Sequence, residues 1–113
     1  MNMFGEKVVV DGETYNCMND YYRWRDLKQL EIDGKISELK RQVKYVLIPA
    51  QRDESGKLVE YEVSYIVDFE YIENGEKVVE DNQSYARGAA YQLFSIKRKL
   101  MLHKFGIKVK ERS

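Results

Sequence analysis

Histidine and cysteine are almost missing from this 113-residue chain, which contains one of each. A single cysteine, Cys17, excludes an internal disulfide and any zinc site built on several thiolates. With His103 as the one histidine, a Ser-His or Cys-His catalytic pair and a histidine-rich metal cage are disfavoured as well. A metal bound here would therefore be held mainly by carboxylates, which suits a hard cation such as Mg²⁺ or Mn²⁺.

The sequence also lacks a long apolar run and an apolar leader. No stretch approaches the roughly 18 apolar residues that a membrane helix needs, so we expect no membrane contact, no secretion and a cytoplasmic protein. The length of 113 residues suits one hydrophobic core. We therefore expect a single domain over residues 1–113.

Acidic and basic residues balance overall, but they are unevenly placed along the chain. Residues 1–85 contain 11 Lys and Arg against 18 Asp and Glu, whereas residues 86–113 contain 8 against 1. This asymmetry is compatible with carboxylate metal ligands beside a phosphate-binding surface. It is equally compatible with oppositely charged segments that pack together and neutralise each other.

Hydrophobic spacing predicts a helix, three antiparallel strands, a second helix and a last strand. The first helix begins near residues 17–19 and ends at Asp33-Gly34, and the first strand ends at Pro49. The second helix spans residues 88–104, and a short strand follows at 107–110. The buried stripe of the second helix is expected at Ala89, Ala90, Leu93, Ile96 and Leu100. The order predicts an α/β fold of the mixed α+β kind, with about four to five strands in a mixed sheet flanked by two helices.

The central hairpin carries the candidate site. One long strand is expected from Val59 to Tyr71, followed by a tight turn at Asn74-Gly75 and a return strand. Its apolar face is expected to hold Val59, Tyr61, Val63, Tyr65, Val67, Phe69 and Tyr71. Alternation puts Asp68 on the other face, and it puts Asp81 and Gln83 together on one face of the return strand. An acid on one strand beside an acid-x-polar triplet on the next is an arrangement that can bind a metal ion.

Motifs along nearly the whole chain carry a resemblance to a known family. They are Val10-Asp11-Gly12 with Tyr15, the helix around Asp20 ending in Leu30-Glu31, residues 42–51 with Leu47-Ile48-Pro49-Ala50, residues 65–71 around Asp68-Phe69, residues 78–81, and residues 97–101 followed by Gly106-Ile107. In this order the chain resembles a small phage and prophage family without an assigned function. That family lies in the PD-(D/E)XK nuclease-like superfamily, so the resemblance implies a restriction-endonuclease-like, or Holliday-junction-resolvase-like, α-β-β-β-α-β core.

The resemblance also implies roles for individual residues. Asp68 and Asp81 take the places of the metal-binding acids, and Asp20 that of a first-helix glutamate. The chain departs from the family pattern at four points. Asp20 is one methylene shorter than glutamate, Gln83 replaces the lysine of the triplet, Ser84 replaces a glycine, and the segment before residue 97 is longer. All four departures fall at the implied site.

Gln83 determines how much chemistry the implied site retains. Two carboxylates on adjacent strands can hold Mg²⁺, which activates water and neutralises charge on a phosphodiester. The usual lysine adds positive charge near the transition state, whereas glutamine forms hydrogen bonds without a charge. Losing one preorganised contact of this kind typically costs about 10²- to 10³-fold in rate.

A basic helix face and tail form the candidate surface for nucleic acid or another partner. Its residues are Arg87, Lys97, Arg98, Lys99, Lys104, Lys108 and Lys110. They can neutralise backbone phosphates, or they can form a solvated helix flank.

Three functions fit these residues. The first is a catalytically impaired, nuclease-like phage protein that acts by binding DNA or a host nucleic-acid-processing protein, such as a CRISPR effector that it inhibits. The second is an active Mg²⁺- or Mn²⁺-dependent DNA endonuclease or junction resolvase, in which Asp68 and Asp81 hold the metal, Asp20 assists and Gln83 positions water. The third is a structural phage protein unrelated to nucleic acid. We expect the first, and a homodimer stays an open alternative.

Overall fold

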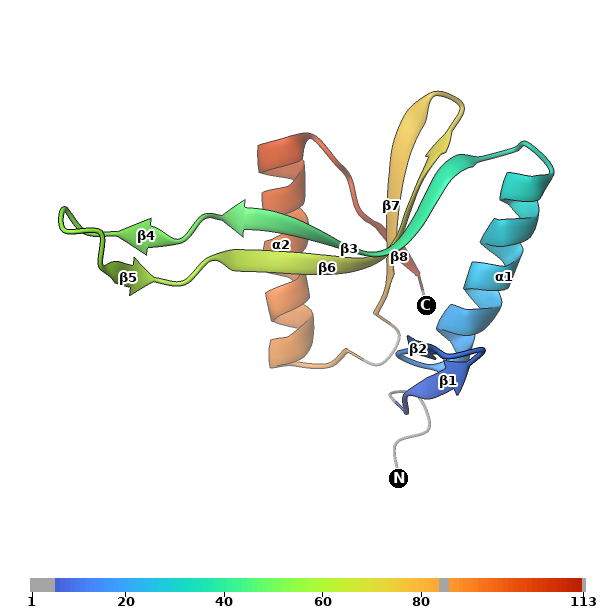
Figure 1. Ribbon diagram of the computed structural model, residues 1–113, viewed down its shortest axis with the longest axis horizontal. Coiled ribbons are helices and arrows are strands. Elements are labelled where there is room, and N and C mark those ends of the chain that lie inside the picture. The colour runs from blue at the N-terminus through green and yellow to red at the C-terminus, as the bar shows by residue number, and fades with distance from the viewer. Residues whose placement is uncertain (1–5, 84–85, 113) are drawn as a thin grey trace.

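The computed structural model of the chain describes residues 6–83 and 86–112 (Figure 1). Its helices are α1, Met18–Ile32, and α2, Ala89–Phe105. Its strands are β1 (Val8–Val10), β2 (Glu13–Tyr15), β3 (Ser37–Ile48), β4 (Gln51–Arg52), β5 (Leu58–Glu60), β6 (Val63–Glu73), β7 (Glu76–Asn82) and β8 (Lys110–Arg112). Neither helix is long and apolar enough to cross a membrane within these described ranges.

A four-stranded mixed sheet, ordered β3-β6-β7-β8, forms the centre of the fold. Strands β3, β6 and β7 pair antiparallel, and β8 pairs parallel to β7. A parallel neighbour needs a crossover connection, which α2 supplies here. The order α1-β3-β6-β7-α2-β8 confirms the predicted mixed α/β class, and two small sheets, β1-β2 and β4-β5, are added to it.

The turn between β6 and β7 has the backbone that its sequence predicts. Asn74 and Gly75 have φ values of 53° and 78°, the left-handed pair that a two-residue hairpin turn requires. The turn fixes the register in which Phe69 lies opposite Glu80. Consequently Asp68 and Asp81 lie next to each other at the same level of the sheet.

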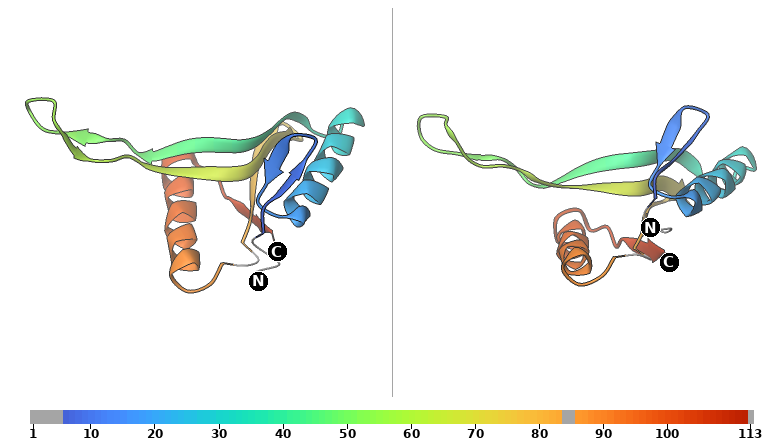
Figure 2. Two further views of the ribbon diagram at one scale, coloured as in Figure 1. Left: turned by 60° about the horizontal axis from the view of Figure 1, so that its bottom comes forward. Right: turned by 90° about the horizontal axis from the view of Figure 1, so that it is seen from below.

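The two helices cover different lengths of the sheet and create two hydrophobic clusters. Figures 1 and 2 show α2 beside the middle of the β3–β6 ribbon. Helix α1 lies near the end of the ribbon that is opposite the β4–β5 hairpin. The α2 cluster contains Leu47, Tyr65, Val67, Val79, Phe94, Met101 and Val109. The α1 cluster contains Leu27, Ile36, Phe69 and Tyr71. The boundary between the clusters falls at Asp68.

At this boundary, the inward side chains of β6 stop facing α2 and begin to face α1. Simple alternation puts Val67 and Phe69 on one face, yet Val67 packs in the α2 cluster and Phe69 in the α1 cluster. On β3, Gln42 lies between the partners of these two residues and has a left-handed φ of 54°. A left-handed residue inside a strand turns the ribbon locally, which accounts for the change of face.

The prediction of one continuous strand from Val59 to Tyr71 was wrong. The pairing breaks between β5 and β6, and Tyr61, which was expected on the buried face, is 81% exposed. Figure 2 shows the cause, since the β4–β5 hairpin extends beyond both helices. An alternating apolar face becomes a core only where another element covers it, and none covers Val59 or Tyr61.

The predicted buried stripe of α2 was also wrong for most of its residues. Ala89, Ala90, Leu93 and Ile96 are exposed, and Leu100 is partly buried. The helix instead buries Phe94 and Met101, the larger side chains one position further along. This rotation of the helix turns its basic residues as well.

Candidate functional site

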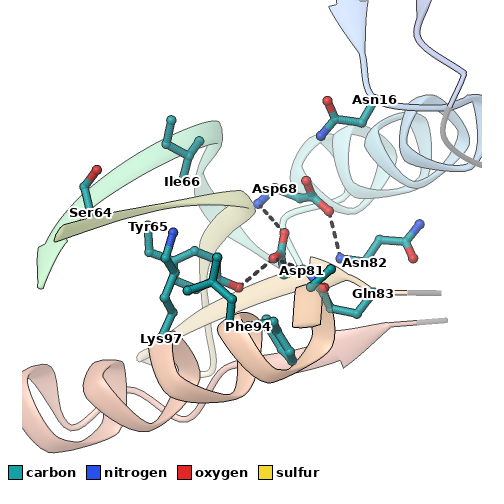
Figure 3. Close-up of a pocket in the computed structure, with 12 residues that line it drawn as sticks. Asn16, Ser64, Tyr65, Ile66, Asp68, Asp81, Asn82, Gln83, Phe94 and Lys97 are labelled. Atoms are coloured by element: carbon teal, nitrogen blue, oxygen red, sulfur yellow. Dashed lines mark hydrogen bonds between the residues drawn. The ribbon is translucent and has the colours of Figure 1, made fainter. Parts of the chain in front are cut away.

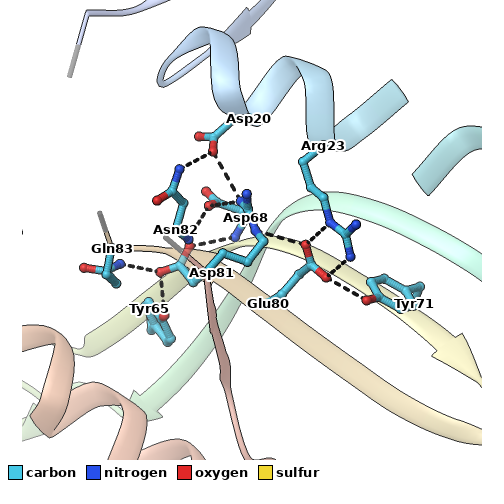
Figure 4. Close-up of polar contacts among 10 residues, drawn as sticks. Asp20, Arg23, Tyr65, Asp68, Tyr71, Glu80, Asp81, Asn82 and Gln83 are labelled. Carbon is cyan, nitrogen blue, oxygen red and sulfur yellow. Dashed lines mark hydrogen bonds and ion pairs between the residues drawn. The ribbon is translucent and has the colours of Figure 1, made fainter. Parts of the chain in front are cut away.

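The three acids predicted from the sequence come together at the junction of α1, β6 and β7 (Figure 4). Asp20 lies in the first turn of α1, Asp68 lies within β6, and Asp81 lies near the end of β7. Their side chains are nearly buried, with each residue 4–5% exposed. Buried acids on three separate elements require partners that offset their charge.

Both carboxylate oxygens of Asp81 accept hydrogen bonds. Its Oδ1 accepts from the backbone N–H of Asp68 at 3.1 Å. Its Oδ2 accepts from the Tyr65 hydroxyl at 2.6 Å and from the Gln83 amide at 2.8 Å. Burial raises the pKa of Asp81, while the bonds from Tyr65, Asp68 and Gln83 oppose that rise. Gln83 thus binds the acid itself.

Asp68 has a more strongly altered acidity. Its Oδ2 accepts from the backbone N–H of Asn82 at 2.8 Å and from Arg112 Nη2 at 3.0 Å. Burial, followed by the negative charges of Asp81 and Asp20, raises the pKa of Asp68 to about 8. Burial and the two neighbouring acids thus favour the protonated form of this carboxyl, whereas the Arg112 guanidinium favours its charged form.

Arg112 is the central residue that the sequence analysis missed. Its Nη2 donates to Asp20 Oδ1 at 3.2 Å and to Asp68 Oδ2 at 3.0 Å. Its Nε lies 3.0 Å from Glu80 Oε1. The one signal in the sequence was the alternating series Lys108, Lys110 and Arg112, which is typical of a strand face.

A second polar cluster surrounds Glu80, the residue before Asp81. Glu80 is fully buried and accepts from Arg23 Nε at 2.7 Å, from Arg23 Nη2 at 2.9 Å and from the Tyr71 hydroxyl at 2.6 Å. Burial alone raises the pKa of Glu80, but the bonds from Arg23 and Tyr71 outweigh it and leave the pKa below its ordinary value. Asn82 joins the clusters to α1, because its amide donates to Asp20 Oδ1 at 3.2 Å.

A pocket of about 490 Å³ opens beside Asp68 and Asp81 (Figure 3). Strands β6 and β7 supply Ser64, Asp68 and Asp81, and Gln83 follows β7. Helix α2 supplies the opposite wall with Phe94 and Lys97. Within the residues that the structure describes, Lys97 is the one basic side chain in this lining.

The other predicted basic residues have different surroundings. Arg98 lies 3.9 Å from Glu111 and over the ring of Phe94. Lys104 donates to the backbone carbonyl of Val46 at 2.9 Å. Lys99 is exposed, and Arg87 donates to the carbonyl of Ala86. Contacts within the protein therefore occupy Arg98 and Lys104.

The acids do not form a ready metal site as they are arranged. Over residues 6–83 and 86–112, no group of three or more His, Cys, Asp or Glu side chains is placed to hold a metal ion. The Arg112 guanidinium bridges Asp20 and Asp68, and protein donors occupy both oxygens of Asp81. A divalent cation bound among these acids would compete with the guanidinium of Arg112 and with the donors to Asp81. The replacement of glycine by Ser84 lies outside the described residues.

Fold and site together define a small mixed α/β protein with a buried acid cluster that adjoins a polar pocket. A family model described as "Protein of unknown function (DUF1064)" matches residues 2–111, and the chain therefore belongs to this family. No curated protein and no solved structure matches the chain.

Proposed function

We propose that this chain is a nuclease-like protein of phage or prophage origin, in the PD-(D/E)XK superfamily, that binds DNA in the host cytoplasm and cleaves it weakly or not at all. The element order and the meeting of Asp20, Asp68 and Asp81 support the nuclease-like part of the proposal. The absence of acidic residues from α2, beside Lys97, Arg98, Lys99 and Lys104, supports DNA as the partner.

The contact of Arg112 with two of the acids carries the proposal of weak catalysis. An arginine is permanently charged, so its guanidinium offsets the negative charge of Asp20 and Asp68 as a bound cation would. It cannot coordinate and activate a water molecule, which is the step that a metal supplies to phosphodiester hydrolysis. The negative charge of the site is thus partly offset without the group that performs the chemistry.

Gln83 supports the same conclusion. Its amide donates to Asp81 Oδ2, so it stabilises an acid of the protein. The lysine expected at this position would bring a positive charge to the reacting phosphate. The glutamine therefore fits a site that retains its shape and lacks one electrostatic contribution.

The alternative, an active Mg²⁺- or Mn²⁺-dependent endonuclease, is favoured by one observation. Lys97 lines the pocket that also contains Asp68 and Asp81, so a lysine is present from another element. This alternative requires that a metal bind Asp68 in competition with Arg112.

A cleavage and binding assay tests the proposal. Supercoiled plasmid and a four-way junction are incubated with Mg²⁺ or Mn²⁺ and with wild-type, Asp68→Ala, Gln83→Lys and Arg112→Ala proteins, and binding to labelled DNA is measured by fluorescence anisotropy. We expect the wild-type protein to bind DNA without cleaving it. Cleavage by wild type that disappears in Asp68→Ala would establish the alternative, and an absence of DNA binding would overturn the proposal.

A further inference from the structure

We propose that Lys97 binds a backbone phosphate of DNA inside the pocket, so that α2 supplies the positive charge that Gln83 does not. This inference rests on the proposed function and names the place where the phosphate lies. In Figure 3, Lys97 extends from α2 toward β6 and lies beside Tyr65, and it lines the same pocket as Asp68 and Asp81.

Lys97 differs from its neighbours on α2 in its contacts. Arg98 and Lys104 interact with Glu111 and with backbone carbonyls of β3, respectively. Lys97 is partly buried and has no hydrogen-bond or ion-pair partner within residues 6–83 and 86–112. A lysine that lines a polar pocket without a partner is available for an anion, because a charge-assisted hydrogen bond to a phosphate is stronger than a neutral one.

Other groups of the pocket also favour an anion. Ala90, in the first turn of α2, lines it, and that turn contains no acidic residue and no side-chain cap. The positive end of the helix dipole therefore lies at the edge of the pocket and favours an anion there. Ser64 and Asn16 add a hydroxyl and an amide that can donate hydrogen bonds.

The two acids in the pocket do not exclude a phosphate. Arg112 pairs with Asp68, and hydrogen bonds from Tyr65 and Gln83 satisfy Asp81. The negative potential that reaches the ligand is reduced accordingly. Ile66 and Leu93, both more than half exposed, line the apolar part of the pocket and suit the sugar of a nucleotide.

The test measures DNA binding by fluorescence anisotropy over a series of NaCl concentrations. Wild type is compared with Lys97→Ala, Lys97→Arg and Lys99→Ala, and with Lys35→Ala as a matched charge control. Lys35 is exposed in the turn after α1 and is not among the residues that line the pocket. Circular dichroism checks that each variant is folded.

We expect Lys97→Ala to weaken binding by about tenfold and to lower the slope of log K against log[salt] by about one, because one phosphate contact is lost. Lys99→Ala should weaken binding less, Lys97→Arg should retain most of the affinity, and Lys35→Ala should bind as wild type does. Equal losses in Lys97→Ala and Lys99→Ala would overturn the inference while DNA binding itself stands. A wild-type protein that does not bind DNA would overturn both proposals.

Discussion

Two neighbouring residues of β7, Glu80 and Asp81, are both buried acids, yet their surroundings have opposite effects on acidity. Glu80 contacts two arginines, Arg23 and Arg112, and its pKa lies below the ordinary value. Asp81 lies against a second acid, Asp68, and the pKa values of both are raised. The strand directs them to opposite faces of the sheet, so each belongs to a separate cluster.

The difference separates a structural ion pair from a candidate site. Around Glu80 the cations match the buried negative charge, and the pocket beside this cluster is lined by Arg23 and Arg112 and not by the acid. Around Asp68 and Asp81 the charge is only partly offset, and the acids line a pocket. A raised pKa in a cleft is typical of functional sites, because a buried acid that destabilises the fold is retained where it has a functional role. Arg112 contacts both clusters and couples them.

The largest effect is expected from Glu80→Ala. Removing this carboxylate leaves Arg23 and Arg112 without their buried partner, and breaking a buried ion pair in this way typically costs about 3–5 kcal/mol. The free energy of unfolding is measured by urea denaturation at pH 7. The matched control is Glu76→Ala, an exposed acid of the same strand, for which we expect a change below about 0.5 kcal/mol. Similar losses in the two variants would remove the distinction between the clusters.

The pH is expected to change the stability contributions of the two clusters with opposite signs. The pKa of Asp68 rises from 3.8 to about 8 on folding, so between these values the folded state binds more protons than the unfolded state. Its contribution to stability therefore decreases as the pH rises from about 4 to about 8. The contribution of Glu80 is present above its ordinary pKa of 4.5 and is lost as the pH falls through its lower folded value.

Urea denaturation of wild type and Asp68→Asn from pH 5 to pH 9 isolates the first of these contributions. The asparagine retains an oxygen that can accept from Asn82 and Arg112, but it does not titrate. We expect a decline in stability with rising pH in the wild type and a flatter profile in the variant. Two parallel profiles would show that Asp68 does not titrate in this range.

The meeting of Asp68 and Asp81 was predictable because alternation along β6 and β7 and the Asn74-Gly75 turn are local properties of the sequence. The place of Asp20 beside them was implied only by the family resemblance. The contacts of Arg112 were not predictable. They depend on the parallel register of β8 against β7, which pairs Asn82 with Arg112 across a crossover and which no local pattern specifies.

The place of Lys97 was missed for a related reason. The sequence predicted the inward face of α2 at Leu93, Ile96 and Leu100, whereas the helix is rotated so that Phe94 and Met101 pack inward. Several faces of an apolar helix have similar hydrophobicity, and the fit against Tyr65 and Val67 selects between them. That rotation brings Lys97 to the pocket.

The smallest effect is expected at Gln42, where the β3–β6 ribbon turns between the α1 and α2 hydrophobic clusters. Its φ of 54° is strained for a residue with a Cβ and is readily adopted by glycine. The variants Gln42→Gly and Gln42→Ala both remove the exposed side chain, so their difference reports the backbone alone. We expect the glycine variant to be more stable than the alanine variant by about 1 kcal/mol in urea denaturation. In an ordinary strand residue the order reverses, because glycine loses more entropy on folding. A more stable alanine variant would therefore mean that β3 does not turn here, and that another feature directs Val67 to α2 and Phe69 to α1.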